Sequence, residues 1–172
     1  KDAEPLTAPI RAAEARFRPT GPPASPVTAT HFFCWALFGG AHGEMRETLG
    51  TCLIATGAHL GMQKEMLSAL RTMQGSRLGL YVREAGEGSL VRLRELFTGA
   101  EGRCHVAGGY AGREGELWLA RVLPSPAPDI EHGVVFTMPY VILEPGPEQW
   151  ERALRETAGS MDSAAAYERL MK

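Results

Sequence analysis

Hydrophobic residues recur at steps of three and four along the first half of the chain, a spacing that predicts helices. The stretch 31–38 (HFFCWALF) is apolar almost all round, so we expect a helix over about 27–39 that is buried on most sides. Ser25 with Pro26, or Thr28, suits the start of this helix, and two glycines follow its end.

The helical spacing resumes over 44–74, where Gly50, Gly57 and Gly61 interrupt it. Each glycine costs roughly 1 kcal/mol relative to alanine in a helix interior. Two explanations are open: a partner helix approaches closely at the glycines, or the segment breaks into two helices near residue 57. Either way, the helical stretches together predict a helical hairpin.

From Gly75 the period of the pattern falls from 3.6 to 2, which predicts strands. The expected strands cover 77–83, 90–97, 103–107, 117–123 and 133–143. Pro139 lies inside the last of them and requires an edge position or a bulge there. Short strands at hairpin spacing, rich in glycine, predict a five-stranded antiparallel sheet or a small, partly closed barrel.

These elements predict an α+β protein made of consecutive parts. The parts are an N-terminal segment with a proline-rich linker (1–26), the helical hairpin (27–74), the antiparallel β-domain (75–144) and C-terminal helices (145–172). The linker ends in TGPPASP, whose prolines prevent regular hydrogen bonding, and PGP begins the C-terminal helices.

Three stretches of the β-domain carry a resemblance to a known family. They are, in order, LGLYVREAGEGSLVRLRELFTG (78–99), GELWLARVLP (115–124) and VVFTMPYVIL (134–143). Together, residues 78–143 resemble a small β-domain of uncharacterised bacterial proteins, some of which carry a zinc-binding SEC-C tail. The resemblance implies a fold rather than an activity, and no zinc role follows from it because the cysteine-rich tail is absent from this sequence.

The net charge of −2 comes from an acidic excess in residues 129–172, and no block is strongly basic, so we do not expect nucleic acid as a partner. The three cysteines, Cys34, Cys52 and Cys104, adjoin apolar stretches and suggest reduced thiols in a cytoplasmic protein. The longest strongly apolar run, 32–38, is too short to span a membrane. We therefore expect a cytoplasmic protein without membrane contact.

Four side chains could form a zinc site if the helices bring them together: His31, Cys34, Cys52 and His59. Their spacing matches no common zinc pattern, and Cys34 lies in the densest apolar run, so we favour core packing and expect no metal or other cofactor. Cys104 is followed by a histidine, but neighbours on a strand point to opposite faces and cannot form a nucleophile and its base.

The glycine-rich segment 108–116 (GGYAGREGE) lacks the ending of a phosphate-binding loop, so we expect a hairpin loop with Tyr110 and Arg113 as its contact residues. Several arginines on the strands, with two aromatic residues, offer a surface that could stack single-stranded nucleic acid. These residues are Arg83, Arg92, Arg94, Arg103 and Arg121 with Tyr81 and Trp118. Interleaved glutamates favour an ordinary solvated sheet face instead.

We expect a non-catalytic module for protein–protein interaction or scaffolding within a larger bacterial protein or complex, with another protein chain, or another domain of the same protein, as its partner. The predicted contact residues are Trp35 in the apolar helix and Met62, Met66 and Met73, because methionine suits adaptable interfaces. Two alternatives remain open, a small nucleic-acid-binding barrel and an enzyme whose site forms no linear motif. No catalytic residue is assigned.

Overall fold

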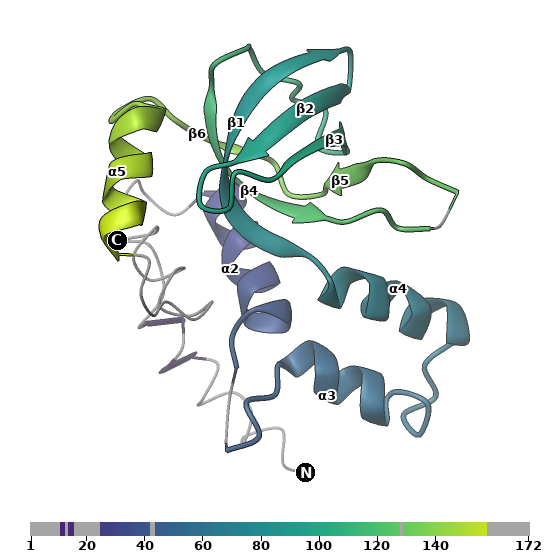
Figure 1. Ribbon diagram of the computed structural model, residues 1–172. Coiled ribbons are helices and arrows are strands. Elements are labelled where there is room, and N and C mark those ends of the chain that lie inside the picture. Colours follow the sequence, from purple (N-terminus) through teal and green to yellow (C-terminus); the bar gives the residue numbers. More distant parts are fainter. Residues whose placement is uncertain (1–10, 13, 16–24, 42–43, 128, 158–172) are drawn as a thin grey trace.

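The computed structural model describes residues 11–12, 14–15, 25–41, 44–127 and 129–157. It shows a closed β-barrel with helices packed against one side and below it (Figure 1). Most of the predicted N-terminal segment and the last predicted helix lie outside the described residues.

Helices α2 (Pro26–Phe38), α3 (Leu49–Thr56) and α4 (Lys64–Gln74) precede the barrel, and residues 11–12 and 14–15 are also helical. The predicted start of α2 is confirmed by a capping box. In it the Thr28 N–H donates to Ser25 Oγ at 3.2 Å, and the Ser25 N–H donates to Thr28 Oγ1 at 2.8 Å. The segment therefore contains three helices rather than the two of a simple hairpin.

The two explanations for the glycines apply at different positions. Helix α3 ends at Thr56 with Gly57 as its C-cap, so the predicted break near residue 57 is confirmed. At Gly50, an added Cβ would lie 2.9 Å from the Leu37 carbonyl oxygen and against the Gln74 side chain. Gly50 is therefore where α3 approaches its neighbouring helices closely.

The strands begin and end near the predicted positions. They are β1 (Arg77–Glu87), β2 (Leu90–Glu95), β3 (Glu101–Val106), β4 (Leu117–Leu123), β5 (Gly133–Val135) and β6 (Tyr140–Ile142). The last predicted strand is broken into β5 and β6, and Pro139 lies in the break. The structure thus has a break at this proline, rather than the predicted bulge or edge position within one strand.

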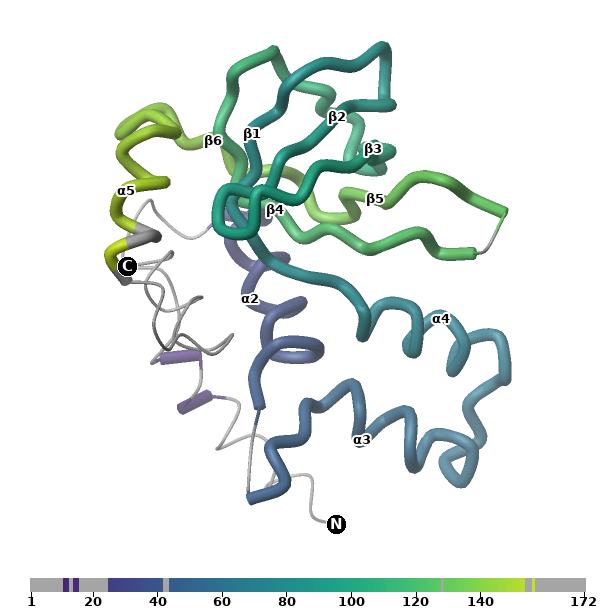
Figure 2. Tube along the Cα trace, in the orientation of Figure 1, coloured from purple at the N-terminus to yellow at the C-terminus, as the bar shows by residue number. Residues whose placement is uncertain are grey.

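The strand order is β1-β2-β3-β5-β4, and pairing of β1 with β4 closes the five strands into a barrel (Figure 2). Strand β5 pairs with residues 122–123 of β4, and β6 pairs with residues 117–119 of the same strand. The prediction of a wholly antiparallel sheet was wrong, because β3 and β5 run parallel, with Cys104 opposite Gly133. After its antiparallel turn from β4, β5 inserts between β4 and β3, and this position makes it parallel to β3.

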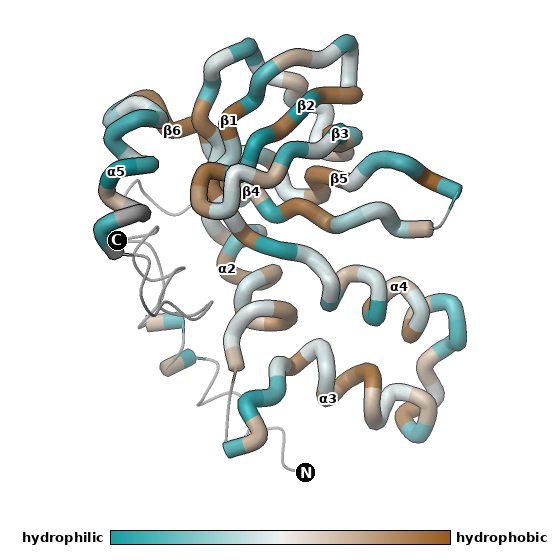
Figure 3. The backbone as a smooth tube through the Cα atoms, in the orientation of Figure 1, coloured by the Kyte–Doolittle hydropathy of each residue, from teal (hydrophilic) through white to brown (hydrophobic). Residues whose placement is uncertain are grey.

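The alternation along the strands separates two hydrophobic cores, and hydrophobic and hydrophilic residues interleave along β2 (Figure 3). The barrel interior contains Tyr81, Val91, Leu93, Cys104, Val106, Trp118, Ala120 and Val135. The outer core joins α2 to the barrel wall through Phe32, Trp35, Leu80, Val82, Leu96, Leu117 and Leu119. Strand β4 contributes to both cores, which explains its strongly apolar sequence.

The predicted helix after PGP is confirmed as α5 (Pro147–Thr157), which lies on the opposite side of the barrel from α4 in Figure 1. Trp150 packs against the outer core. Arg94 of β2 holds this helix through Glu151 at 2.8 Å and also pairs with Glu84 at 3.0 Å. No helix in the described part of the chain is long and apolar enough to cross a membrane.

Candidate binding site

The predicted contact residues of the helices fall into two groups. Trp35 is only 2% exposed and packs between α2 and the barrel, so its side chain offers no surface to a partner. Met66 is 53% exposed on α4. Met62 and Met73 are half-buried near the two ends of the same helix. The accessible methionines therefore gather at α4, and Trp35 belongs to the core.

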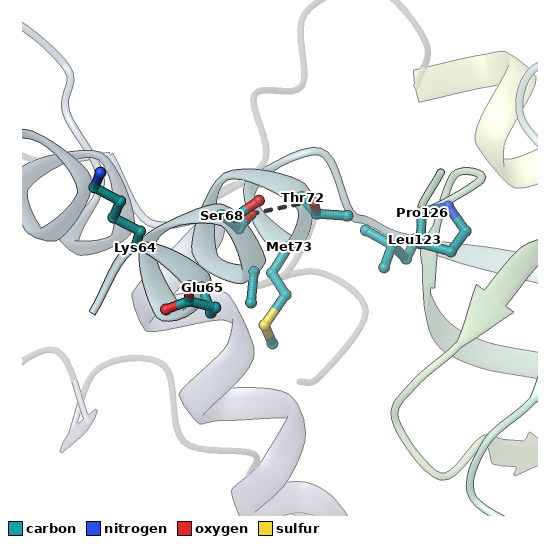
Figure 4. A pocket seen from close by; sticks show the side chains of 8 residues that line it. Lys64, Glu65, Ser68, Thr72, Met73, Leu123 and Pro126 are labelled. Carbon is teal, nitrogen blue, oxygen red and sulfur yellow. Dashed lines mark hydrogen bonds between the residues drawn. The ribbon is translucent and has the colours of Figure 1, made fainter. Parts of the chain in front are cut away.

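A groove runs between α4 and the end of β4 (Figure 4). Its volume is about 640 Å³, and its lining consists of Lys64, Glu65, Ser68, Ala69, Thr72, Met73, Leu123 and Pro126. The first six residues recur at three- and four-residue steps and share one face of α4. We call this hollow the α4 groove.

The loop between β3 and β4 closes one end of the barrel. Trp118 Nε1 donates to Glu116 Oε2 at 2.9 Å, and the Tyr110 hydroxyl donates to Glu116 Oε1 at 2.9 Å. The rings of Tyr110 and Trp118 lie 6.1 Å apart. Tyr110, a predicted contact residue, thus has a structural partner, whereas Arg113 is exposed in the loop.

Two further residues fill this closed end. Arg83 is buried and donates from Nε to the Ala111 carbonyl oxygen at 3.3 Å and from Nη2 to that of Gly86 at 3.4 Å. Gly112 has φ +64° and lies against the Trp118 ring, where an added Cβ would overlap it. The barrel is therefore sealed at the β3–β4 loop.

The opposite end of the barrel is open and forms a hollow of about 710 Å³, here called the barrel mouth. Its interior is lined by Tyr81, Leu93, Cys104 and Val122. Its rim includes Arg77, Glu95, Phe97, Thr98, Glu101, Arg103 and Ser125. Mouths of β-barrels are frequent sites for small ligands, and this volume lies in the usual range for them.

The ionisable groups inside the mouth stay protonated at neutral pH. Burial raises the pKa of the Cys104 thiol to about 11, although a backbone hydrogen bond from Gly133 opposes the rise. Burial, together with the nearby Glu95 carboxylate, raises the pKa of Tyr81. A thiol with such a pKa is a poor nucleophile. The mouth is therefore suited to binding rather than to thiol chemistry.

Sequence reasoning did not identify the mouth. Alternation along the strands grouped Tyr81 with the arginines of a possible exposed face, and it could not show which end of a barrel would be left unfilled. The available signal was glycine at inward-facing positions on two different strands, Gly102 and Gly133. Their convergence becomes visible only once the strand order is known.

The four residues considered for zinc do not form one cluster. His31 is 1% exposed and its Nε2 lies 3.2 Å from the Met138 carbonyl oxygen, and Cys34 is half-buried on the same helix. Cys52 and His59 are exposed at α3 and after it. Among the described residues, no three His, Cys, Asp or Glu side chains gather closely enough to hold a metal ion.

The arginines and aromatic residues considered for nucleic acid are divided by the barrel wall. Tyr81 and Trp118 lie in the interior. Arg92 and Arg103 are exposed and directly opposite each other on β2 and β3. Arg121 is buried and donates from Nε to Ser76 Oγ at 2.8 Å. The predicted surface for base stacking is therefore not assembled from these residues.

Comparison with known proteins assigns no family: no protein-family model matches the chain, and no curated protein matches its sequence. The resemblance of residues 78–143 to a β-domain of uncharacterised bacterial proteins thus stays a prediction.

Proposed function

We propose that this chain is a non-catalytic interaction module that binds another protein chain, or another domain of the same protein, at the α4 groove. One observation carries the proposal: α4 presents Ala69 and Met73 to a hollow whose opposite wall is Leu123 and Pro126. A groove along a helix with such an apolar strip, bordered by polar side chains such as Ser68 and Thr72, suits an amphipathic segment of a partner. Met66, exposed on the same helix, can adapt to the shape of such a segment.

The cellular setting forms part of the same proposal. We place the module in the cytoplasm, as part of a larger bacterial protein or complex. The cysteines Cys34, Cys52 and Cys104 are all free thiols, which supports a reducing compartment. Lys64 and Glu65 give the groove edge one charge of each sign, so the partner segment needs no strong net charge.

Nucleic-acid binding has less support. Small Greek-key barrels include nucleic-acid-binding folds, and Arg92 and Arg103 form a local basic pair on the outer face. Single-stranded nucleic acid also needs aromatic platforms, and the predicted ones, Tyr81 and Trp118, lie inside the barrel. The α4 groove therefore provides the better-supported function.

The test places a photo-crosslinking amino acid at Ser68, which is exposed in the groove, and at Arg71, which is exposed on the same helix outside it. In cells of the native source, we expect one protein to be crosslinked from position 68 and not from position 71. The partner is then purified, and its affinity for the wild-type chain is measured by titration calorimetry.

Two glutamate substitutions on the same helix provide the matched comparison. Ala69→Glu places a charge in the apolar groove and should weaken binding at least tenfold, whereas Arg71→Glu should change it by less than about threefold. Equal crosslinking from both positions, or full affinity of the Ala69→Glu variant, would show that the groove is not the interface.

A further inference from the structure

The barrel mouth is hollow because of the residues that face inward at this end. Inward positions on β3 and β5 are Gly102 and Gly133, which line the hollow and place no side chain in it. An added Cβ at Gly102 would meet no described atom within 4 Å, so the space beside it is open. An added Cβ at Gly133 would lie 2.7 Å from the Leu123 carbonyl oxygen, so that wall is tightly packed.

The inner surface of the mouth is largely apolar. Leu93 and Val122 line it together with the protonated Cys104 thiol. The Tyr81 ring lies over Gly79, whose added Cβ would be 3.1 Å from it. Among the described residues, the Tyr81 hydroxyl makes one long hydrogen bond, of 3.5 Å, to the Arg77 carbonyl oxygen. The hydroxyl is therefore available as a donor to a ligand that enters the hollow.

The charged side chains at the rim differ in how far they are already hydrogen-bonded within the protein. Glu95 accepts from the Phe97 N–H at 3.1 Å and from the Thr98 N–H and hydroxyl at 2.6 Å each, so its carboxylate is already used to hold the turn. Arg77 donates from Nη1 to the carbonyl oxygens of Gly75 and Ser76 at 3.2 Å each. It forms no ion pair with any described residue.

The remaining rim charges come from β3. Arg103 and Glu101 border the hollow, but Arg103 lies on the outer face beside Arg92, and Glu101 lies opposite Arg94, whose guanidinium is held by Glu84 and Glu151. Next to Tyr81 the rim therefore carries the Glu95 carboxylate, which is held by its own turn, and the Arg77 guanidinium, which pairs with no described carboxylate. A hollow with an apolar interior and such a guanidinium at its edge suits a ligand that is apolar at one end and anionic at the other.

We propose that the barrel mouth binds a small amphipathic carboxylate, whose apolar group fills the space between Tyr81, Leu93 and Val122 and whose carboxylate pairs with Arg77. The Tyr81 hydroxyl donates a further hydrogen bond to the ligand. This site is separate from the α4 groove, although Leu123 contributes to the walls of both hollows. Its ligand need not be part of the partner that the groove binds.

The test uses 3-phenylpropionate as the probe and uncharged 3-phenylpropionamide as its matched control. Each is titrated into the intact chain while backbone amide shifts are followed by NMR. We expect the acid to bind at least tenfold more tightly than the amide, with the largest shifts at Gly102, Cys104 and Gly133. A second titration uses a short peptide that ends in phenylalanine, with either a free or an amidated C-terminus. Binding of the free-carboxylate peptide alone would identify the C-terminus of a protein chain as a ligand, whereas binding of 3-phenylpropionate without the peptide would identify a small free acid.

Two variants locate the site. Gly102→Leu places a side chain in the open space and should abolish binding, while its amide spectrum reports whether the barrel is intact. Arg77→Gln should weaken binding of the acid about tenfold and leave binding of the amide unchanged, whereas Arg92→Gln, on the outer face, should alter neither. The proposal is overturned if neither probe binds at millimolar concentration, if acid and amide bind equally, or if Arg77→Gln binds the acid as the wild type does.

Discussion

Two polar side chains, Arg121 and His31, are buried between α2 and the barrel, where burial disfavours their charged forms. Arg121 is 3% exposed, and its guanidinium lies 5.8 Å from the centre of the Phe38 ring. Burial lowers the pKa of Arg121, and Ser76 is its hydrogen-bond partner. A buried cation with no described carboxylate in contact is costly, and the Ser76 hydrogen bonds and the Phe38 ring offset part of this cost.

His31 makes stability depend on pH at the same interface. Burial lowers its pKa below 6.5, the nearby Arg121 charge lowers it further, and the bond to Met138 opposes the change. The unfolded chain therefore binds a proton that the folded chain excludes. The contribution of His31 to the free energy of unfolding is fully present above about pH 6.5 and falls as the pH drops toward the pKa of the folded state. The total loss is about 1.4 kcal/mol for each tenfold difference in proton affinity between the unfolded and folded chains.

Urea unfolding at pH 7.5 and 5.5 measures this dependence. The wild-type chain should lose stability at the lower pH, and His31→Gln should lose clearly less. His59→Gln, at an exposed position, is the matched control and should follow the wild type. An unchanged pH dependence in the His31 variant would assign the loss of stability to other groups.

At the scale of elements, helices α2, α3 and α4 are joined by one glutamine. Gln74 at the end of α4 accepts from Thr48 Oγ1 at 3.0 Å and donates from Nε2 to the Phe38 carbonyl oxygen at 3.2 Å. These bonds connect the end of α4 to the start of α3 and the end of α2. Gly50 lies beside Gln74 and allows the approach.

The close approach predicts that Gly50→Ala is destabilising, although alanine normally favours a helix. The added methyl group would press on the Leu37 carbonyl and the Gln74 side chain, and we expect the free energy of unfolding to fall by roughly 1–3 kcal/mol. Urea denaturation gives the value. Gly146→Ala, where the new Cβ would meet no described atom within 4 Å, should change stability little. A Gly50 variant as stable as the wild type would remove the argument for close packing.

At the scale of the whole molecule, the helical segment and the barrel share one core. Phe32 and Trp35 of α2 pack on Leu80 of β1 and on Leu117 and Leu119 of β4. Removing α2 would expose this apolar wall to water. The predicted boundary at residue 75 thus separates two patterns along the chain, but the residues on either side pack together.

This shared core predicts that residues 75–144 do not fold alone. Expressed without the helices, the segment should give poorly dispersed amide signals in an NMR spectrum. Residues 25–157, which keep both cores, should give a dispersed spectrum and one cooperative thermal transition. A folded 75–144 fragment would show that the outer core is dispensable.

Where the elements lie was predictable from the sequence, because it depends on neighbours along the chain. The alternation around Leu93 marks a strand whatever its partners are, Gly57 and Ser25 favour the ends and starts of helices, and Pro139 cannot continue a central strand. The inward and outward faces of β2 followed from the same alternation. These preferences act within a few residues, so the order of amino acids alone determines them.

Only the tertiary structure decided which distant residues meet. The insertion of β5 between β3 and β4 makes the sheet mixed and closes the barrel, and nothing local to residues 133–135 specifies it. The burial of Trp35 and the convergence of Gly102 and Gly133 at an open mouth likewise depend on that closure. Contacts between segments far apart in sequence determine which apolar residues become core and which end of the barrel stays open, and a one-dimensional pattern does not contain them.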